Sequence, residues 1–154
     1  METKTRILIA DSNQDFSKLL TELFRSEEDL DVLACAGDGV EALRLLSELK
    51  PDVLLLDLVL PKLDGLELLR RLPETGCTPH IIVLSGFVNS KVVADCSACG
   101  ADYFIPKPCD VPVLLGHIRQ IAQGGPQADS SAGIDFKNAT VTSRRDADLE
   151  SVVT

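Results

Sequence analysis

The sequence predicts one α/β domain over residues 1–123, in which a parallel β-sheet lies between two layers of helices. Two observations predict this fold. Short apolar runs alternate with amphipathic stretches of helical length, which is the pattern of strands joined by helical crossovers. One run, residues 53–56, is apolar at every position, as in a strand that is buried on both faces of a parallel sheet.

The first half of the chain is expected to hold three strands and two helices. The strands cover residues 7–10, 30–36 and 53–56. The first helix covers residues 14–25, and its apolar side chains at helical spacing should face the core: Phe16, Leu19, Leu20, Leu23 and Phe24. The second helix follows a glycine-rich break and runs to about residue 50, with one apolar face made of Val40, Leu43, Leu46 and Leu49. Pro51 then forces the chain out of the helical conformation.

The second half is expected to hold two strands and three helices. The strands cover residues 81–84 and 103–105, and the helices cover about residues 65–72, 90–99 and 111–123. Asp64, with Glu67 three residues later, is the expected cap of the first of these helices. Gly100 is the expected stop of the second.

Polar side chains follow the ends of four expected strands. Asp11, Asp57, Ser85 and Lys107 each come at or just after the end of an apolar run. The carboxyl ends of parallel strands meet at one edge of a sheet, where open α/β sheets bind their ligands. Acids at the ends of the first and third strands indicate that these strands are neighbours. This arrangement predicts the flavodoxin-like strand order 2-1-3-4-5, in a three-layer sandwich with five helices.

Composition and charge narrow the possible classes of function. The 154-residue chain has a net charge of −9, one Tyr and no Trp, which disfavours direct binding of this segment to nucleic acid. No apolar run approaches membrane-spanning length, and the N-terminus lacks the apolar core of a signal peptide. Five scattered cysteines do not form a disulfide pattern, so we expect a reduced, cytoplasmic protein. Residues 124–154 are rich in small and polar residues and are expected to be a flexible tail.

The four strand-end residues together predict phosphoryl chemistry. Asp11 and Asp57 could hold a hard divalent cation such as Mg²⁺, and a carboxylate can also act as a nucleophile that becomes an aspartyl phosphate. Lys107 would supply positive charge and Ser85 a hydrogen bond to the developing phosphoryl group. Each residue alone has an ordinary explanation: a helix cap for Asp57, a turn serine for Ser85 and a solvated lysine for Lys107.

At this point the chain resembles the receiver domains of response regulators, over about residues 5–123. The motifs that carry the resemblance are Asp11, Asp57 with Leu60-Pro61 and Asp64-Gly65, the pair Ser85-Gly86, and Lys107-Pro108. The resemblance implies the CheY-like form of the flavodoxin-like fold. It also implies that Asp57 accepts phosphate from a phosphorylated histidine, and that the Val59 carbonyl joins Asp11 and Asp57 around Mg²⁺. Ser85 and Phe104 would form the switch pair, and the Lys107–Pro108 bond would be cis.

Within the family, the stretches 103–105, 115–120 and 148–154 resemble the transcription regulators that control sporulation. That resemblance implies a phosphorelay protein rather than an enzyme, with a histidine kinase or histidine phosphotransfer protein as donor. DNA would be bound only through a C-terminal domain that follows the tail. Phosphorylation would promote a homodimer through the surface of the last two helices and the fifth strand, with residues Lys91, Asp95, His117, Arg119, Val92, Val93 and Leu114.

One residue departs from the family pattern. The family has two acids after the first strand, whereas here the second is Ser12, at a position that usually ligates Mg²⁺. The departure predicts weak metal binding and leaves open a phosphate-independent interaction module of the same fold. Enzymes that form aspartyl phosphates are a third alternative. They place a second acid two residues after the nucleophile, where this chain has Val59.

Two other groups of residues are weaker candidates. Cys96 and Cys99 have C-x-x-C spacing but lie on an expected helix, without a second pair or a histidine cluster for zinc. His80 and His117 are expected to be structural or to face solvent. We therefore expect no function from either group.

Overall fold

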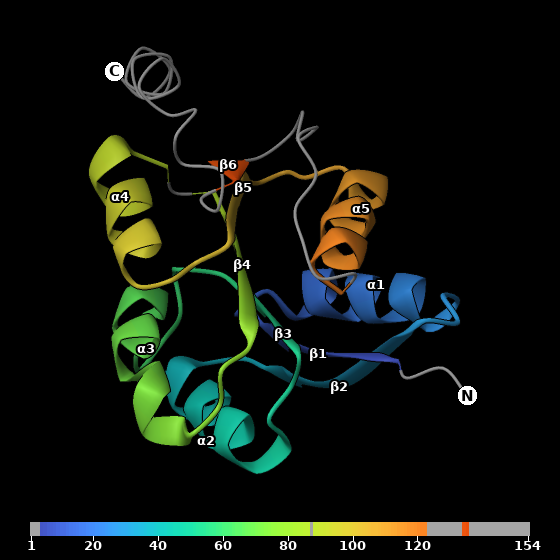
Figure 1. The fold of residues 1–154 in the computed structure, drawn as a ribbon, viewed down its shortest axis with the longest axis horizontal. Helices are drawn as coiled ribbons and strands as arrows, with labels where there is room; N and C mark the ends of the chain where they lie inside the picture. Colours follow the sequence, from blue (N-terminus) through green and yellow to red (C-terminus); the bar gives the residue numbers. More distant parts are fainter. Residues whose placement is uncertain (1–3, 87, 123–133, 136–154) are drawn as a thin grey trace.

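The computed structural model describes residues 4–86, 88–122 and 134–135, and Figure 1 shows their arrangement. The sheet has the order β2-β1-β3-β4-β5-β6, and its first five strands are parallel. These strands are β1 (Thr5–Ala10), β2 (Leu30–Ala36), β3 (Val53–Leu56), β4 (His80–Ser85) and β5 (Tyr103–Pro106). The predicted fold class and the order 2-1-3-4-5 are therefore confirmed.

Five α-helices cover the two faces of the sheet, as predicted. They are α1 (Gln14–Arg25), α2 (Gly39–Leu49), α3 (Gly65–Arg71), α4 (Ser90–Ala98) and α5 (Val111–Ala122). A short 3₁₀ helix, η1 (Leu72–Thr75), extends α3. In Figure 1, α1 and α5 lie on one side of the sheet and α2, α3 and α4 lie on the other. None of the helices in the described part of the chain has the length and apolar character needed to cross a membrane.

The core consists of two apolar layers, one on each face of the sheet. Because side chains alternate along a strand, β3 sends Leu54 and Leu56 to the α2–α3–α4 side and Val53 and Leu55 to the α1–α5 side. All four side chains are at most 1% exposed. The fully apolar strand β3 therefore lies in the interior of the sheet, and Asp57 follows directly at its carboxyl end.

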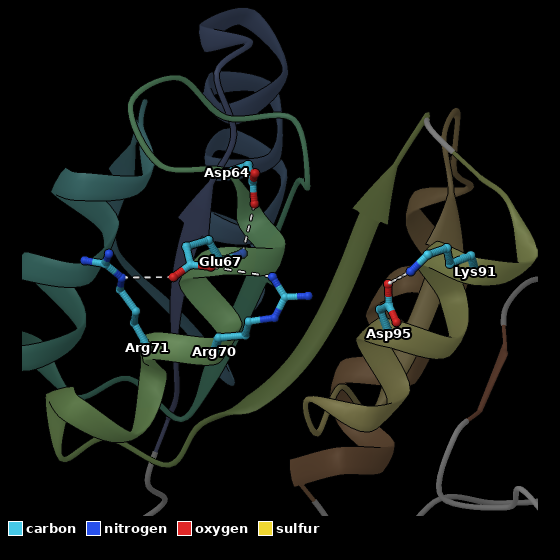
Figure 2. Close-up of polar contacts among 6 residues, drawn as sticks. All are labelled: Asp64, Glu67, Arg70, Arg71, Lys91 and Asp95. Carbon is cyan, nitrogen blue, oxygen red and sulfur yellow. Dashed lines mark hydrogen bonds and ion pairs between the residues drawn. The ribbon is translucent and has the colours of Figure 1, made fainter.

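Side-chain caps fix where four of the helices begin. The side chains of Asn13, Asp38, Asp64 and Asn89 each accept a hydrogen bond from a backbone N–H three residues later. Such caps satisfy a donor that the first helical turn leaves free. Figure 2 shows the cap at Asp64, whose carboxylate accepts from the Glu67 backbone. At α1 the cap is Asn13, which comes directly after Ser12.

Three apolar residues that were predicted to face the core are exposed. Leu19 and Leu23 of α1 are 49% and 39% exposed, and Val40 of α2 is 55% exposed. Helical spacing predicts a broad apolar stripe, but only its centre contacts the sheet. In α1 that centre is Leu20 and Phe24, which are both fully buried.

The sixth strand, β6 (Ile134–Asp135), lies in the segment that was predicted to be a flexible tail. It pairs antiparallel with β5, with Phe104 opposite Ile134 and Tyr103 opposite Asp135. The remaining residues of the predicted tail, 124–133 and 136–154, lie outside the described residues. The chain thus returns after α5 to the outer edge of β5, next to the residue predicted as a switch.

Candidate functional site

Two neighbouring strands deliver the two carboxylates of the site. β1 and β3 pair with Ala10 opposite Leu56, so Asp11 and Asp57 follow at the same level of the sheet. The Asp57 backbone N–H donates to the Ala10 carbonyl at 2.9 Å, which extends the pairing up to the site. Asp11 and Asp57 are 3% and 9% exposed. The sheet therefore holds two carboxylates side by side in a largely desolvated position.

Lys107 connects these carboxylates. Its Nζ lies 2.5 Å from Asp11 Oδ2 and 3.2 Å from Asp57 Oδ2. Its backbone N–H donates to the Ser85 carbonyl at 2.9 Å, which ties the end of β5 to the end of β4. Burial alone would lower the pKa of Lys107, but the hydrogen bonds and charges of Asp11 and Asp57 outweigh burial and raise it. Lys107 is therefore a fixed positive charge between two carboxylates.

The loop after β3 is shaped around Asp57. Its Oδ1 accepts a hydrogen bond from the Val59 backbone at 3.0 Å, and the Gly65 N–H donates to the Leu58 carbonyl at 2.8 Å. A Cβ at Gly65 would lie 2.7 Å from the Asp57 carbonyl oxygen, so a larger residue there would displace this backbone. Gly65 thus allows α3 to start against the strand end that carries Asp57.

Ser12 follows Asp11 directly, at the position where the family pattern has a second acid. Asp11 Oδ1 accepts a hydrogen bond from the Asn13 backbone at 2.8 Å, whereas Ser12 is exposed. Within the described ranges, no three acidic, histidine or cysteine side chains come together in a way that could hold a metal ion. The two carboxylates with one ammonium carry a net charge of −1. This hard-oxygen donor set fits a Mg²⁺ ion that receives the rest of its coordination from water and backbone carbonyls.

The predicted switch residues lie on the neighbouring strands β4 and β5. Ser85 and Phe104 are both 0% exposed. The strand register places Phe104 opposite Val83 and Pro106 opposite Ser85, so Phe104 lies two residues before the level of Ser85. Its side chain belongs to the apolar layer on the α2–α3–α4 side. The Lys107–Pro108 bond is cis, as predicted.

The structure corrects the surface that was predicted for self-association. His117, Val93 and Leu114 are 3%, 5% and 0% exposed, so they offer little contact area. The His117 ring packs against Tyr103 with 4.4 Å between ring centroids. Arg119 is engaged with Glu27 and Asp29, beyond the end of α1. A helical wheel does not distinguish the inner side of α5 from its outer side, because apolar residues occur on both.

The thiols do not form a second site in the described part of the chain. All five cysteines are free. Burial raises the pKa of Cys96 to about 12, so this thiol stays protonated and poorly nucleophilic at neutral pH. His80 is exposed, and its Nδ1 lies 3.6 Å from the buried Asp102 carboxylate. Cys96 is therefore part of the core, and His80 lies at the surface beside Asp102.

One residue at the site was predicted only as a core residue. The Lys107 Nζ lies 4.5 Å from the centroid of the Phe16 ring. Helical spacing directed Phe16 toward the sheet, and the ring is indeed partly buried against the α1–α5 apolar layer. No sequence pattern connects an aromatic residue in the first turn of α1 with a lysine that lies 91 positions later.

A cavity of about 630 Å³ opens beside Asp11. It lies between α1, the loop before α2 and the loop after β3, and its wall includes Asp11, Gln14, Lys18, Asp38 and Lys62. Lys62 Nζ is 3.5 Å from Asp38 Oδ2, which links two of these loops. The cavity thus reaches the site at Asp11, on the side of α1.

Comparison with proteins of known structure gives the same fold. The receiver domain of the putative response regulator NarL from Mycobacterium tuberculosis matches with a TM-score of 0.73 and 23% identity, over 79% of this chain and 98% of that chain. The response regulator domain of CheB from Thermotoga maritima matches with a TM-score of 0.71 and 30% identity, over 80% of this chain and 99% of that one.

A chain of the complex described as CheX–CheY–BeF₃–Mg from Borrelia burgdorferi matches with a TM-score of 0.71 and 30% identity, over 78% of this chain and 90% of that one. A family model described as the response regulator receiver domain matches residues 7–119. That range includes Asp11, Asp57, Ser85 and Lys107. The chain therefore belongs to the response regulator receiver domain family.

Proposed function

We propose that Asp57 is the phosphoacceptor of a two-component or phosphorelay switch. The observation that carries this proposal is the contact of Lys107 with both Asp57 and Asp11 at the carboxyl edge of the sheet. The donor is a phosphorylated histidine on a kinase or phosphotransfer protein. The chain itself is no enzyme, because it supplies the accepting group and is modified by the reaction.

The transfer itself requires few groups from this chain. An Asp57 oxygen attacks the phosphorus, the P–N bond of the donor breaks, and the leaving imidazole nitrogen keeps the electron pair and takes up a proton. Asp11, Asp57 and the Val59 carbonyl would hold a Mg²⁺ ion, which would supply positive charge beside the phosphoryl oxygens. Lys107 supplies a further positive charge at the same edge, and the buried Ser85 supplies a hydroxyl.

The output of the switch involves the β5 region. Phosphate on Asp57 draws the Ser85 hydroxyl toward it, and Phe104 moves into the space that is released. The surface that responds is α4, β5 and α5. On α4, Lys91 and Asp95 form an ion pair with each other at 3.3 Å (Figure 2), so a partner surface meets paired charges there. Self-association through this surface has to accommodate or displace β6, which pairs with β5.

The proposed biological role is regulation of transcription. The named relatives include a NarL receiver domain, and a DNA-binding regulator of the LuxR family from Staphylococcus aureus matches with a TM-score of 0.71 and 22% identity. We propose a cytoplasmic transcription regulator whose DNA-binding domain follows the receiver. A role in sporulation stays a prediction that rests on the residue stretches 103–105, 115–120 and 148–154.

A second candidate is a receiver fold that works without phosphate. The observation in its favour is Ser12, which is exposed and leaves the site with two carboxylates rather than three. In that case the surface of α4, β5 and α5 binds its partner constitutively. Phosphorylation of Asp57 separates the two candidates.

Treatment with acetyl phosphate and Mg²⁺, followed by intact mass measurement and peptide mapping, tests the primary proposal. We expect one phosphoryl group, on Asp57, and none in Asp57→Asn. Asp64→Asn is a matched control in the same loop, because asparagine also caps helices and the cap lies outside the phosphoryl site. Undiminished labelling of Asp57→Asn would overturn the proposal, and no labelling of the unsubstituted protein would favour the phosphate-independent module.

Sedimentation with and without beryllofluoride tests the output. Beryllofluoride mimics the phosphoryl group, and we expect it to shift the protein from monomer to dimer. Asp57→Asn should remain monomeric under both conditions. A protein that stays monomeric at high concentration with bound beryllofluoride would contradict dimerisation as the output.

A further inference from the structure

The ammonium of Lys107 has a third neighbour besides the two carboxylates. Its Nζ lies 4.5 Å from the centroid of the Phe16 ring. A cation within about 6 Å of a ring centroid and over its face is attracted by the negative charge of the π system. The Lys107 side chain is only 20% exposed, so water screens this attraction less than it does at an open surface.

Phe16 belongs to a closed circuit of contacts around Asp11. The Asn13 backbone donates to Asp11 Oδ1 at 2.8 Å, and the Asn13 side chain accepts from the Phe16 backbone at 3.1 Å. The Phe16 ring then contacts Lys107, and Lys107 returns to Asp11 Oδ2 at 2.5 Å. The contacts of the α1 N-cap and the contacts of the Lys107 ammonium therefore share the same residues, Asp11 and Phe16.

The ring itself has little freedom to move away. Phe16 lies in the first turn of α1, and its ring is partly buried against the apolar layer that includes Leu20 and Phe24. α1 packs this layer against the sheet beside α5 (Figure 1). A partly buried ring beside the ammonium restricts where the ammonium can lie, which lowers the entropy that Lys107 loses when it binds a ligand.

We propose that Phe16 is a positioning residue, whose ring face holds the Lys107 ammonium where it meets the phosphoryl group on Asp57. This role rests on the proposed phosphoacceptor function. The aromatic face matters here, and not only the bulk of the side chain. An alkyl side chain of similar size would fill the same space without attracting the cation.

Fluorinated phenylalanines at position 16 separate attraction from bulk. Successive fluorine atoms withdraw charge from the ring face and leave the size and hydrophobic packing nearly unchanged. We expect beryllofluoride affinity to fall steadily along a series from one to three fluorine atoms, by about two- to fivefold in total. Phe16→Leu should lose at least as much, and Phe16→Tyr should retain most of the affinity.

The same series in a Lys107→Gln background is the control. Glutamine carries no charge, so fluorination should have no effect on the affinity that remains. A flat series in the lysine protein would overturn the proposal, as would an equal slope in both backgrounds. Failure of the unsubstituted protein to bind beryllofluoride would instead overturn the phosphoacceptor function.

Proton chemical shifts provide a readout that needs no phosphoryl mimic. A methylene group next to an ammonium that lies over a ring face is shifted upfield by the ring current. We expect upfield shifts for the Lys107 ε-protons and their loss in Phe16→Leu, with the ε-protons of Lys91 unchanged. Lys107 shifts that do not respond to Phe16→Leu would overturn the contact.

Discussion

Two regions of the molecule each bring one cation to two carboxylates that are distant in the sequence. The Lys107 cluster consists of Asp11, Asp57 and Lys107, and the Arg119 cluster consists of Glu27, Asp29 and Arg119. Lys107 lies 96 positions from Asp11, and Arg119 lies 92 positions from Glu27. The charges and the sequence separations are thus almost the same in the two clusters.

The clusters differ in their exposure to water. The side chains of the Lys107 cluster are 3%, 11% and 20% exposed, whereas those of the Arg119 cluster are 30%, 49% and 38% exposed. Water screens the second cluster, so its ion pairs stabilise the fold only slightly. In the Lys107 cluster, the excess negative charge lies in a poorly solvated position, where a carboxylate can bind a cation or act as a nucleophile. Burial, more than charge pattern, separates a candidate site from a structural ion pair.

The largest expected difference between the clusters is in ligand binding. Lys107→Gln should weaken beryllofluoride binding by about ten- to a hundredfold, because a hydrogen bond to a charged group contributes about 1.5–3 kcal/mol. Arg119→Gln should change it by less than about twofold, because Arg119 contacts Glu27 and Asp29 rather than the site. Titration calorimetry measures both. Equal losses in the two variants would mean that Lys107 does not contact the bound phosphoryl mimic.

A smaller effect is expected from the acid that the site lacks. Ser12→Asp should raise Mg²⁺ affinity by roughly tenfold, because one more carboxylate near the ion adds on the order of 1–4 kcal/mol of attraction per unit of cation charge before desolvation. Ser12→Asn is the matched control, since it adds a similar side chain without charge. Titration of the unsubstituted protein and of both variants with Mg²⁺ measures the three affinities. Equal affinities for all three proteins would show that Asp11 or water already fills the position.

The sequence predicts the fold and the centre of the Lys107 cluster well. Apolar runs that end at Asp11, Asp57 and Ser85 place these residues, because parallel strands share one carboxyl edge. The fully apolar run before Asp57 also identifies the central strand. These predictions succeed since they depend on local pattern and on one topological rule.

The sequence does not predict contacts that depend on how helices pack. Phe16 of α1 contacts Lys107 in the loop after β5, and Arg119 of α5 reaches Glu27 beyond the end of α1. The burial of His117 depends on the rotation of α5, which the apolar spacing leaves open. β6 was missed because two residues are too few for a periodic signal. In each case the information lies in tertiary geometry rather than in a sequence window.

The smallest expected effect concerns the Arg119 cluster. The hydrogen bond from Arg119 lowers the pKa of the Asp29 carboxyl below its ordinary value of 3.8. Partial burial of Asp29 opposes this shift but is the smaller effect. The stabilisation is therefore fully present above about pH 3.8 and is lost as the pH falls through the lower pKa of the folded state. Arg119 stays charged throughout, since the hydrogen bonds to Asp29 and Glu27 raise its pKa further.

Arg119→Gln should consequently lower the free energy of unfolding at pH 7 by about 0.2–1 kcal/mol, since exposed ion pairs contribute little. The loss should shrink at high salt and in acid, because screening and protonation of Asp29 remove the attraction in the unsubstituted protein as well. Urea unfolding at two salt concentrations and two pH values measures this loss in the free energy of unfolding. Arg70→Gln, at the exposed Arg70–Glu67 pair on α3, is the control for an ion pair within one helix. A loss that stays constant across salt and pH would assign the effect to packing of the Arg119 side chain rather than to its charge.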